Sequence, residues 1–381
     1  MLRSTLLHEN KLEPYEMLSA PAEWLQSCAN FEPKLHQLSP YIGKLKSTIA
    51  DDLVKKYSCL GDTILDPFAG SGTIPLSAAF LRRRVIAADV SIYSAILTKG
   101  KLFPPENVDE ALRLLEMLEQ KVRNLHLSEI EIPDWIRSFF NPETLLDILK
   151  WTTVLKQDGN EFFLACLLGI LHHQRPGFLS YPSSHLVPYL RDKKFPKENY
   201  PELYEYRDVY PRLIKKIKRA LSTPVPVTTD VRQFYHTPIQ GLKLTDEVSC
   251  IITSPPYMNA LDYFRDNRLR LWFLDPSFDI EKIKEPTNSQ EAFLSCMEHL
   301  FSLASSCLKK NGLCVLVIGD LGRRILGKMT MTELIVHLAQ QYGPHLKHLS
   351  TMTDIVPDVR RSRRNCRGVK NEYIMVFERA C

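Results

Sequence analysis

A strand, a glycine-containing turn and a helix follow one another directly between residues 63 and 81, and this order limits the possible folds more than any other part of the sequence. Residues 63–66 are typical of a buried strand, Gly70 and Gly72 form the turn, and residues 74–81 continue as an apolar helix. Glycines let the backbone approach a ligand closely, and a helix N-terminus favours an anionic or polar group. The segment therefore predicts a ligand-binding turn.

The residues after this helix indicate which ligand the turn holds. A second strand over 85–88 ends in Asp89, and an acidic residue at this place can accept hydrogen bonds from ribose hydroxyls. Gly70 and Gly72 lack the third glycine of the dinucleotide fingerprint. A nucleoside ligand fits this pattern, whereas NAD fits it poorly.

Strand and helix patterns alternate along the rest of the chain. Further strands are expected over 225–229, 248–252, 313–320, 345–351 and 373–377, and helices over 289–308 and 330–342. This alternation predicts an α/β fold with a Rossmann-like, doubly wound, mostly parallel sheet. Residues 1–103 and 223–381 would form that domain, and residues 104–222 would form a mainly helical insertion.

The segment Thr253-Ser254-Pro255-Pro256-Tyr257 follows the expected strand over 248–252, so it should lie at the carboxyl edge of the sheet, where such folds place their sites. The two prolines fix the backbone and remove two N–H donors. Free carbonyls remain beside a hydroxyl and an aromatic face, and this combination suits an amino group on a planar heterocycle. A strand-ending turn with a packing tyrosine is the alternative that these residues leave open.

The composition argues against a membrane-spanning, a secreted or a metal-binding protein. The longest apolar run, residues 162–171, is too short to span a bilayer, and the first residues contain no secretory apolar region. The nine cysteines show no Cys-x-x-Cys spacing, so we expect no metal site. The net charge of +5 permits nucleic-acid binding. We expect a cytoplasmic protein, associated with the nucleoid of a bacterium or archaeon, that does not bind membranes.

Two motifs resemble those of one enzyme family. The sequence Asp-Pro-Phe-Ala-Gly-Ser-Gly-Thr over 66–73 is similar to the S-adenosylmethionine loop of DNA amino-methyltransferases. The segment 253–257 resembles their catalytic motif, in the Ser-Pro-Pro-Tyr form typical of N4-cytosine enzymes, whereas adenine-N6 enzymes more often have Asp or Asn in place of the serine. The resemblance covers roughly residues 31–89 and 225–377. It implies a class I methyltransferase fold.

The resemblance implies S-adenosylmethionine as the cofactor. Asp66 is expected at its amino-acid end, Asp89 at its ribose and Asp230 at its adenine amino group, although Asp230 could instead cap a helix. Residues 36–45 resemble the motif that closes over the methionine end, with an ordinary loop as the alternative. The expected cofactor-binding residues are Asp66, Phe68, Gly70, Gly72, Thr73, Asp89, Asp230 and Lys44.

The resemblance also implies how the amine is methylated. The Ser254 hydroxyl and the Pro255 carbonyl would accept the hydrogens of the amine and draw its nitrogen toward tetrahedral geometry, and Tyr257 would stack on a base flipped out of the duplex. Direct transfer needs positioning more than a strong base, and the final proton is expected to leave to water. The expected catalytic residues are Ser254, Pro255, Pro256 and Tyr257. No Pro-Cys pair occurs in the chain, which argues against 5-methylcytosine formation.

Two basic segments are candidates for DNA contact. Residues 360–370 form the densest charge run and could grip phosphates, although most such runs are solvated loops. Residues 259–268 resemble a run found in related enzymes, with a packed surface helix as the alternative. The expected DNA-binding residues are Arg265, Arg268, Arg360, Arg361, Arg363, Arg364 and Arg367. Sequence reading is expected from the helical insertion, where His172, His173, Gln174, Arg175 and Arg191 could reach base edges.

The sequence therefore predicts a site-specific DNA methyltransferase that acts on the N4 amine of cytosine in duplex DNA. It would be the modification enzyme of a restriction-modification system. No nuclease signature is present, so a restriction endonuclease would be a separate protein. The alternatives are adenine-N6 methylation, RNA base methylation and a silent DNA-binding subunit.

Overall fold

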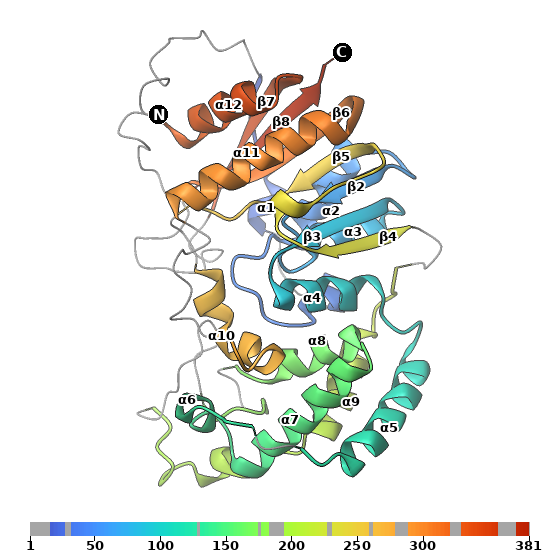
Figure 1. The fold of residues 1–381 in the computed structure, drawn as a ribbon, viewed down its shortest axis with the longest axis vertical. Helices are drawn as coiled ribbons and strands as arrows, with labels where there is room; N and C mark the ends of the chain where they lie inside the picture. Colours follow the sequence, from blue (N-terminus) through green and yellow to red (C-terminus); the bar gives the residue numbers. More distant parts are fainter. Residues whose placement is uncertain are drawn as a thin grey trace.

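The computed structural model describes residues 16–26, 32–127, 130–173, 177–182, 194–226, 231–258, 262–278, 289–320, 329–356 and 371–380. Within these ranges one sheet runs through the upper part of the molecule (Figure 1). Its strands, in spatial order, are β1 (Glu16–Ser19), β7 (Leu346–Ile355), β8 (Asn371–Arg379), β6 (Leu308–Asp320), β5 (Val248–Thr253), β2 (Thr63–Asp66), β3 (Arg84–Asp89) and β4 (Arg232–His236).

The strand directions confirm the predicted doubly wound architecture. β8 runs antiparallel to both of its neighbours, and the other neighbouring pairs run parallel. Because β2, β3, β4 and β5 are parallel, their carboxyl ends meet at the same edge of the sheet. This edge is the place where open α/β sheets bind ligands.

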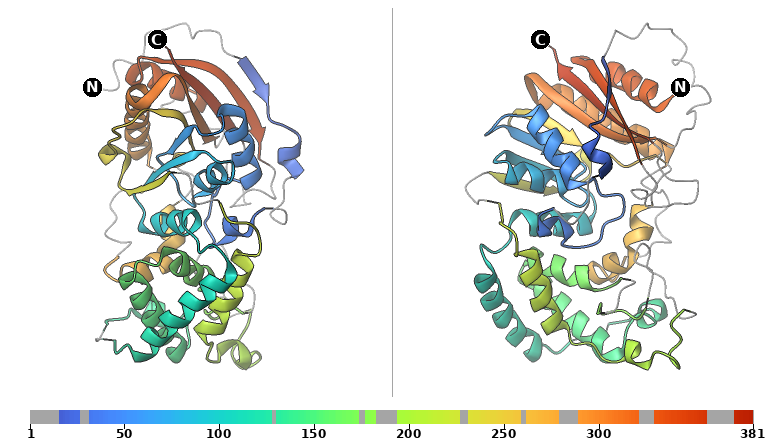
Figure 2. Two further views of the ribbon diagram at one scale, coloured as in Figure 1. Left: turned by 90° about the vertical axis from the view of Figure 1, so that its right-hand side faces the viewer. Right: turned by 180° about the vertical axis from the view of Figure 1, so that it is seen from behind.

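Helices cover both faces of the sheet (Figure 2). Alternating residues of the buried strands face opposite layers: Ile64 packs with α2 (Ser47–Tyr57) and α3 (Thr73–Phe80), and Leu65 packs with α11 (Gln290–Cys307) and α12 (Met331–Tyr342). The helix α1 (Glu23–Gln26) and the 3₁₀ helices at Lys34–Gln37, Pro201–Tyr204 and Ile239–Gly241 are short.

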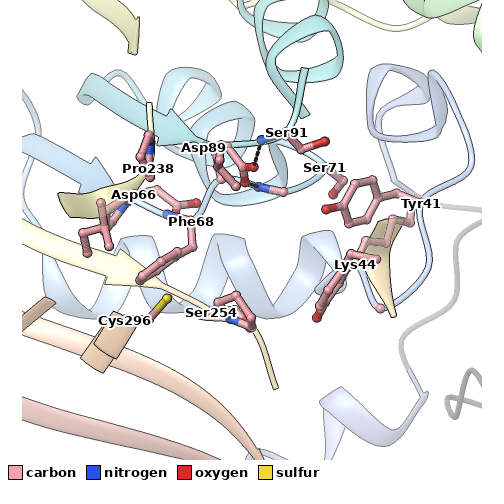
Figure 3. A pocket seen from close by; sticks show the side chains of 18 of the residues that line it. Tyr41, Lys44, Asp66, Phe68, Ser71, Asp89, Ser91, Pro238, Ser254 and Cys296 are labelled. Carbon is pink, nitrogen blue, oxygen red and sulfur yellow. Dashed lines mark hydrogen bonds between the residues drawn. The ribbon is translucent and has the colours of Figure 1, made fainter. Parts of the chain in front are cut away.

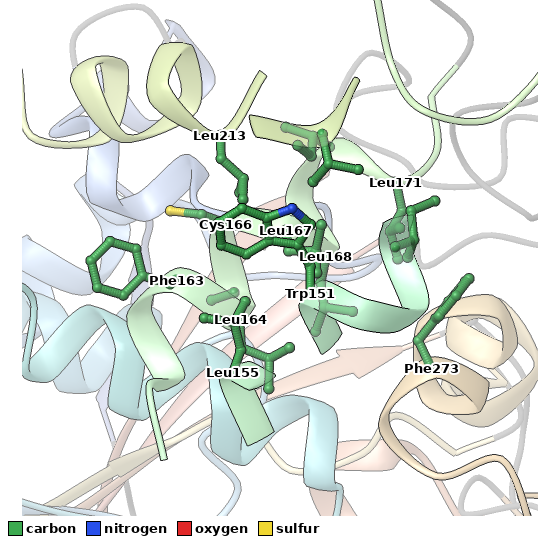
Figure 4. Packing of buried hydrophobic residues seen from close by; sticks show 14 of the residues in the cluster. Trp151, Leu155, Phe163, Leu164, Cys166, Leu167, Leu168, Leu171, Leu213 and Phe273 are labelled. Atoms are coloured by element: carbon green, nitrogen blue, oxygen red, sulfur yellow. The ribbon is translucent and has the colours of Figure 1, made fainter. Parts of the chain in front are cut away.

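A separate group of helices lies beyond one side of the sheet, in the lower half of Figure 1. It contains α5 (Val108–Asn124), α6 (Asp134–Arg137), α7 (Pro142–Gln157), α8 (Glu161–Ile170) and α9 (Val209–Ala220). These helices share one apolar cluster with α4 (Ile92–Leu102) and α10 (Tyr263–Leu274), in which Trp151, Leu164 and Phe273 are buried (Figure 4). Helix α10 lies outside residues 104–222 in the sequence, yet it completes the apolar cluster of these helices. The division into a catalytic domain and an insertion at residues 104 and 222 remains a prediction.

The strand expected over residues 225–229 lies later in the sequence, as β4. Val225 and Pro226 are outside any strand, and β4 instead comprises Arg232–His236, so the prediction of a strand over 225–229 is wrong for its described residues. Among the described strands β4 pairs with β3 alone, at the edge of the sheet, and its sequence Arg-Gln-Phe-Tyr-His has no apolar run. Asp230, which is expected at the adenine amino group of the cofactor, lies outside the described residues and precedes β4 in the sequence.

In the described part of the chain, no helix combines the length and apolar character that crossing a membrane requires. The same residues contain no group of three His, Cys, Asp or Glu side chains that could hold a metal ion.

Candidate active site

A cavity of about 490 Å³ opens at the carboxyl edge formed by β2, β3, β4 and β5. Each strand brings residues to its wall: Asp66 from β2, Asp89 from β3, Pro238 after β4 and Ser254 after β5. Figure 3 shows Tyr41 and Lys44 at one end of the cavity and Phe68 and Pro238 toward the other. The two sequence motifs, about 190 residues apart, thus meet in one space.

Asp89 is tied to the glycine turn. Its carboxylate accepts hydrogen bonds from the backbone N–H groups of Gly70, at 2.8 Å, and Ser91, at 2.9 Å. Burial raises the pKa of Asp89, and the two backbone N–H groups oppose that rise. These contacts fix the carboxylate beside the turn where it lines the cavity.

Helix α4 supports the glycine turn from behind, which the sequence did not reveal. Ser94 donates to the carbonyl of Gly70, and the ammonium of the fully buried Lys101 donates to the carbonyl of Ser71. Gly72 has a left-handed backbone, with φ of 71°, and lies directly against Thr98. Positions 94, 98 and 101 lie on one side of the helix, so one surface of α4 sets the shape of the turn.

Asp66 links the two motifs. Its Oδ1 accepts from the Thr253 hydroxyl at 2.6 Å and from the Phe68 N–H at 3.3 Å. The residue is 2% exposed, and burial raises its pKa to about 7 against the weaker opposing effect of the Thr253 hydrogen bond. Asp66 is therefore a buried carboxyl group whose charge depends on pH near neutrality.

The raised pKa of Asp66 predicts a pH dependence of stability. The folded protein holds a proton on Asp66 more tightly than the unfolded chain, so the free energy of unfolding should fall as pH rises from about 4 to about 7 and level off above. The contribution is at most about 4 kcal/mol. Asp66→Asn keeps the oxygen acceptor but cannot ionise. Urea unfolding at several pH values should show a shallower decline for this variant, and an unchanged decline would contradict the prediction.

The loop before α2 closes one end of the cavity. The Tyr41 ring stacks on Tyr93 with 5.9 Å between centroids and lies 6.2 Å from Tyr263. Lys44, an expected cofactor residue, lines the cavity, while its ammonium donates to the His36 carbonyl at 3.1 Å and lies 3.5 Å from a Glu32 oxygen. Phe68, Gly70 and Thr73 also line this cavity, as expected from their positions in the turn.

The Pro-Pro segment presents two of its residues to the cavity. Ser254 and Pro256 line it, whereas Pro255 is buried and Tyr257 is only 6% exposed. The ring of Tyr257 packs on Gly319 of β6, where an added Cβ would lie 2.2 Å from the ring. The stacking of Tyr257 on a flipped base remains a prediction. In this structure the Tyr257 ring is buried against Gly319.

Contacts of the Ser254 and Tyr257 hydroxyls reach a residue that the sequence did not single out. Ser254 Oγ donates to the Tyr257 hydroxyl at 3.2 Å, and that hydroxyl donates to Glu372 Oε1 at 2.9 Å. Glu372 stands at the start of β8, 115 residues after Tyr257. No local motif marks it, because only the pairing of β6 with β8 brings it here.

The expected DNA-contacting residues differ in their surroundings. Arg265 is exposed on α10, whereas Arg268 is half-buried, with its guanidinium 5.7 Å from the centre of the Trp135 ring. His172 is 1% exposed against Phe139, so it belongs to the core and cannot reach base edges. Several other candidates lie outside the described residues: Gln174, Arg175, Arg191, Asn259, Arg360, Arg361, Arg363, Arg364 and Arg367.

Comparisons with known proteins identify families that this chain resembles. The model of a DNA methylase family matches residues 34–98, which include the loop before α2, the glycine turn and Asp89. The chain resembles the DNA amino-methyltransferases. This match supports S-adenosylmethionine as the cofactor.

Curated proteins extend this resemblance beyond residues 34–98. Type II methyltransferase M.BsoBI of Geobacillus stearothermophilus is 26% identical over 70% of this chain and 57% of its own length. Type II methyltransferase M.AvaI of Nostoc sp. is 27% identical over 56% of this chain and 48% of its own. The chain thus spans about half the length of these relatives. Among solved structures, the rRNA methyltransferase aviRa of Streptomyces viridochromogenes matches with 12% identity over 94% of both chains and a TM-score of 0.33.

Proposed function

We propose that this chain transfers a methyl group from S-adenosylmethionine to the N4 amine of cytosine within a short site in duplex DNA. The observation that carries the proposal is that Ser254, Asp66 and Asp89 line one cavity, so the residues that would hold the amine and the cofactor face the same space. The match to a DNA methylase family supports DNA as the substrate. The serine in the Ser-Pro-Pro-Tyr motif favours cytosine over adenine.

The cavity fits the proposed cofactor in size and chemistry. About 490 Å³ lies within the usual range for ligands of this size. Asp89 would accept from the ribose hydroxyls, and Asp66 would face the cationic amino-acid end, where a positive charge would favour ionisation of its carboxyl group. Phe68, Pro238 and Ile239 line the cavity and would form apolar walls around the adenine ring. When bound, the cofactor supplies a methyl group activated by the sulfonium.

The amine would be held by acceptors at the cavity wall. The Ser254 hydroxyl has lone pairs left to accept an N–H, because its own hydrogen points to Tyr257. The Pro255 carbonyl would accept the second N–H, as the motif implies. These acceptors position the amine and increase the electron density at its nitrogen, which is the main contribution that a direct transfer requires.

We also propose how this chain contacts DNA and which protein it works with. Arg265 is an exposed cation on α10, the helix that follows the catalytic segment, and would contact phosphates. The helices of 104–222 would form a target-recognition region beside the catalytic domain. Because the curated relatives are named Type II methyltransferases, we propose a modification role with a separate restriction endonuclease.

The proposal is tested by methyl transfer from labelled S-adenosylmethionine to mixed-sequence duplex DNA, with tRNA and protein-free DNA as parallel samples. Label should accumulate in duplex DNA alone. Label in tRNA would favour an RNA methyltransferase. If the cofactor binds calorimetrically but no label enters either nucleic acid, the proposed activity is wrong.

A further inference from the structure

The methylation proposed above leaves one proton to be removed. The amine nitrogen forms a bond to the methyl carbon while the sulfur–methyl bond breaks, and the positive charge of the sulfonium passes to the nitrogen. The nitrogen must then lose one of its protons to give the neutral methylamine. A group that accepts this proton near the cavity would assist the reaction.

We propose that Ser254, Tyr257 and Glu372 form a proton relay that carries this proton from the amine to the Glu372 carboxylate. The inference rests on the proposed function. The amine proton moves to Ser254 Oγ, the Ser254 hydroxyl proton moves to the Tyr257 oxygen, and the Tyr257 proton moves to Glu372. The serine and tyrosine end as they began, and the carboxylate ends protonated.

The hydrogen bonds already have the direction that this relay needs. Ser254 Oγ donates to the Tyr257 oxygen at 3.2 Å, and Tyr257 donates to Glu372 Oε1 at 2.9 Å. Ser254 lies at the cavity wall, so its free lone pairs can accept from a substrate. Each donor is therefore paired with an acceptor one step farther from the cavity.

Burial separates the middle of the relay from water. Tyr257 is 6% exposed and lies on Gly319, which pairs directly with Glu372 across β6 and β8. Because Gly319 has no side chain, the Tyr257 ring can pack against it, with its hydroxyl within hydrogen-bond distance of Glu372. Glu372 itself is half-buried, so a proton that it receives can pass on to solvent. The proposed relay is an alternative to the direct loss of the proton to water that the sequence predicts.

Other ionisable groups lie near Glu372 among the described residues. Asp354 of β7 is opposite Glu372 in the strand register, so the two side chains project from the same face. Asp320 ends β6 one residue after Gly319, and Tyr263 on α10 interacts electrostatically with both Tyr257 and Glu372. A test of Glu372 must therefore separate its ionisation from that of Asp354 and Asp320.

The relay is tested by Glu372→Gln and Tyr257→Phe, which keep size while removing one proton acceptor or carrier. Each should lower kcat about 100-fold with little change in KM for DNA. The double variant should be no slower than either single one, since both break the same path. Because Asp66 also lines the cavity and titrates near neutrality, kcat is measured at saturating S-adenosylmethionine: the decline of kcat at acid pH should become smaller in Glu372→Gln and keep its wild-type size in the control variants Asp354→Asn and Asp320→Asn.

A second test measures thermal stability and does not depend on catalytic turnover. In the cofactor-free protein, the Tm shifts of Tyr257→Phe and Glu372→Gln should be non-additive, since Phe removes the donor of one hydrogen bond and Gln replaces its charged acceptor with a neutral amide oxygen. If the wild-type protein methylates DNA, a Glu372→Gln variant with the wild-type kcat would overturn the relay. A double variant whose loss of kcat equals the product of the two single losses would also overturn it. Absence of wild-type methyl transfer would instead overturn the proposed function.

Discussion

Replacing Gly72 with alanine is expected to lower the cofactor affinity at least tenfold and to destabilise the protein by about 2–5 kcal/mol. Gly72 has φ of 71°, and its added Cβ would lie 2.8 Å from Thr98 Oγ1 and 3.0 Å from Thr98 Cα. The backbone of α4 cannot yield as a side chain can, so the turn must move. Calorimetric titration with S-adenosylmethionine and chemical unfolding measure the two effects.

Gly61 provides a matched control for the Gly72 substitution. It has φ of 80°, but an added Cβ meets no atom within 4 Å. Gly61→Ala should therefore show only the backbone cost of about 1 kcal/mol, with cofactor affinity unchanged. In the Gly72→Ala background, Thr98→Ala should restore part of the stability by removing the nearest oxygen. Equal losses at Gly61 and Gly72 would show that contact with α4 does not shape the turn.

Replacing Ser254 with alanine should reduce kcat at least about 100-fold while leaving S-adenosylmethionine binding within about twofold of wild type. The substitution removes the hydroxyl at the cavity wall that would accept from the amine and donate to Tyr257. It does not alter the glycine turn or Asp89. Single-turnover methylation of duplex DNA, with calorimetric cofactor titration, separates the two quantities.

The control for Ser254 is another serine-to-alanine change. Ser302 is exposed on α11, where its hydroxyl donates to the Glu298 carbonyl at 2.9 Å. Ser302→Ala should keep wild-type kcat and affinity. A Ser254→Ala enzyme that retains most of its activity would remove the serine from the proposed chemistry. Loss of cofactor binding in this variant would indicate a role in binding instead.

The parts of the fold that the sequence predicted well depend on local patterns. The strand at 63–66, the turn at Gly70 and Gly72, and the helix after it follow from short-range apolar runs and glycine positions. The strand before Ser254 is equally apolar, and the sequence predicts it for the same reason. Since parallel strands place their carboxyl ends together, the meeting of the two motifs could also be predicted.

The features that the sequence did not predict depend on contacts between distant segments. β4 has a polar sequence because it is an edge strand, so the β-branched residues before it gave a misleading signal. Lys101 supports the glycine turn across 30 residues, and Glu372 meets Tyr257 across 115. Such pairs have no spacing rule, because the strand order and the helix packing alone decide which side chains meet.

The proposed reaction is methylation of the N4 amine of cytosine in DNA at this one cavity. The most direct measurement is mass spectrometry of nucleosides digested from duplex DNA after incubation with the protein and isotopically labelled S-adenosylmethionine. The expected result is label in N4-methyldeoxycytidine, which is lost with Ser254→Ala. Label in N6-methyldeoxyadenosine would contradict the assignment to cytosine, and absence of label from every deoxynucleoside would contradict the account as a whole.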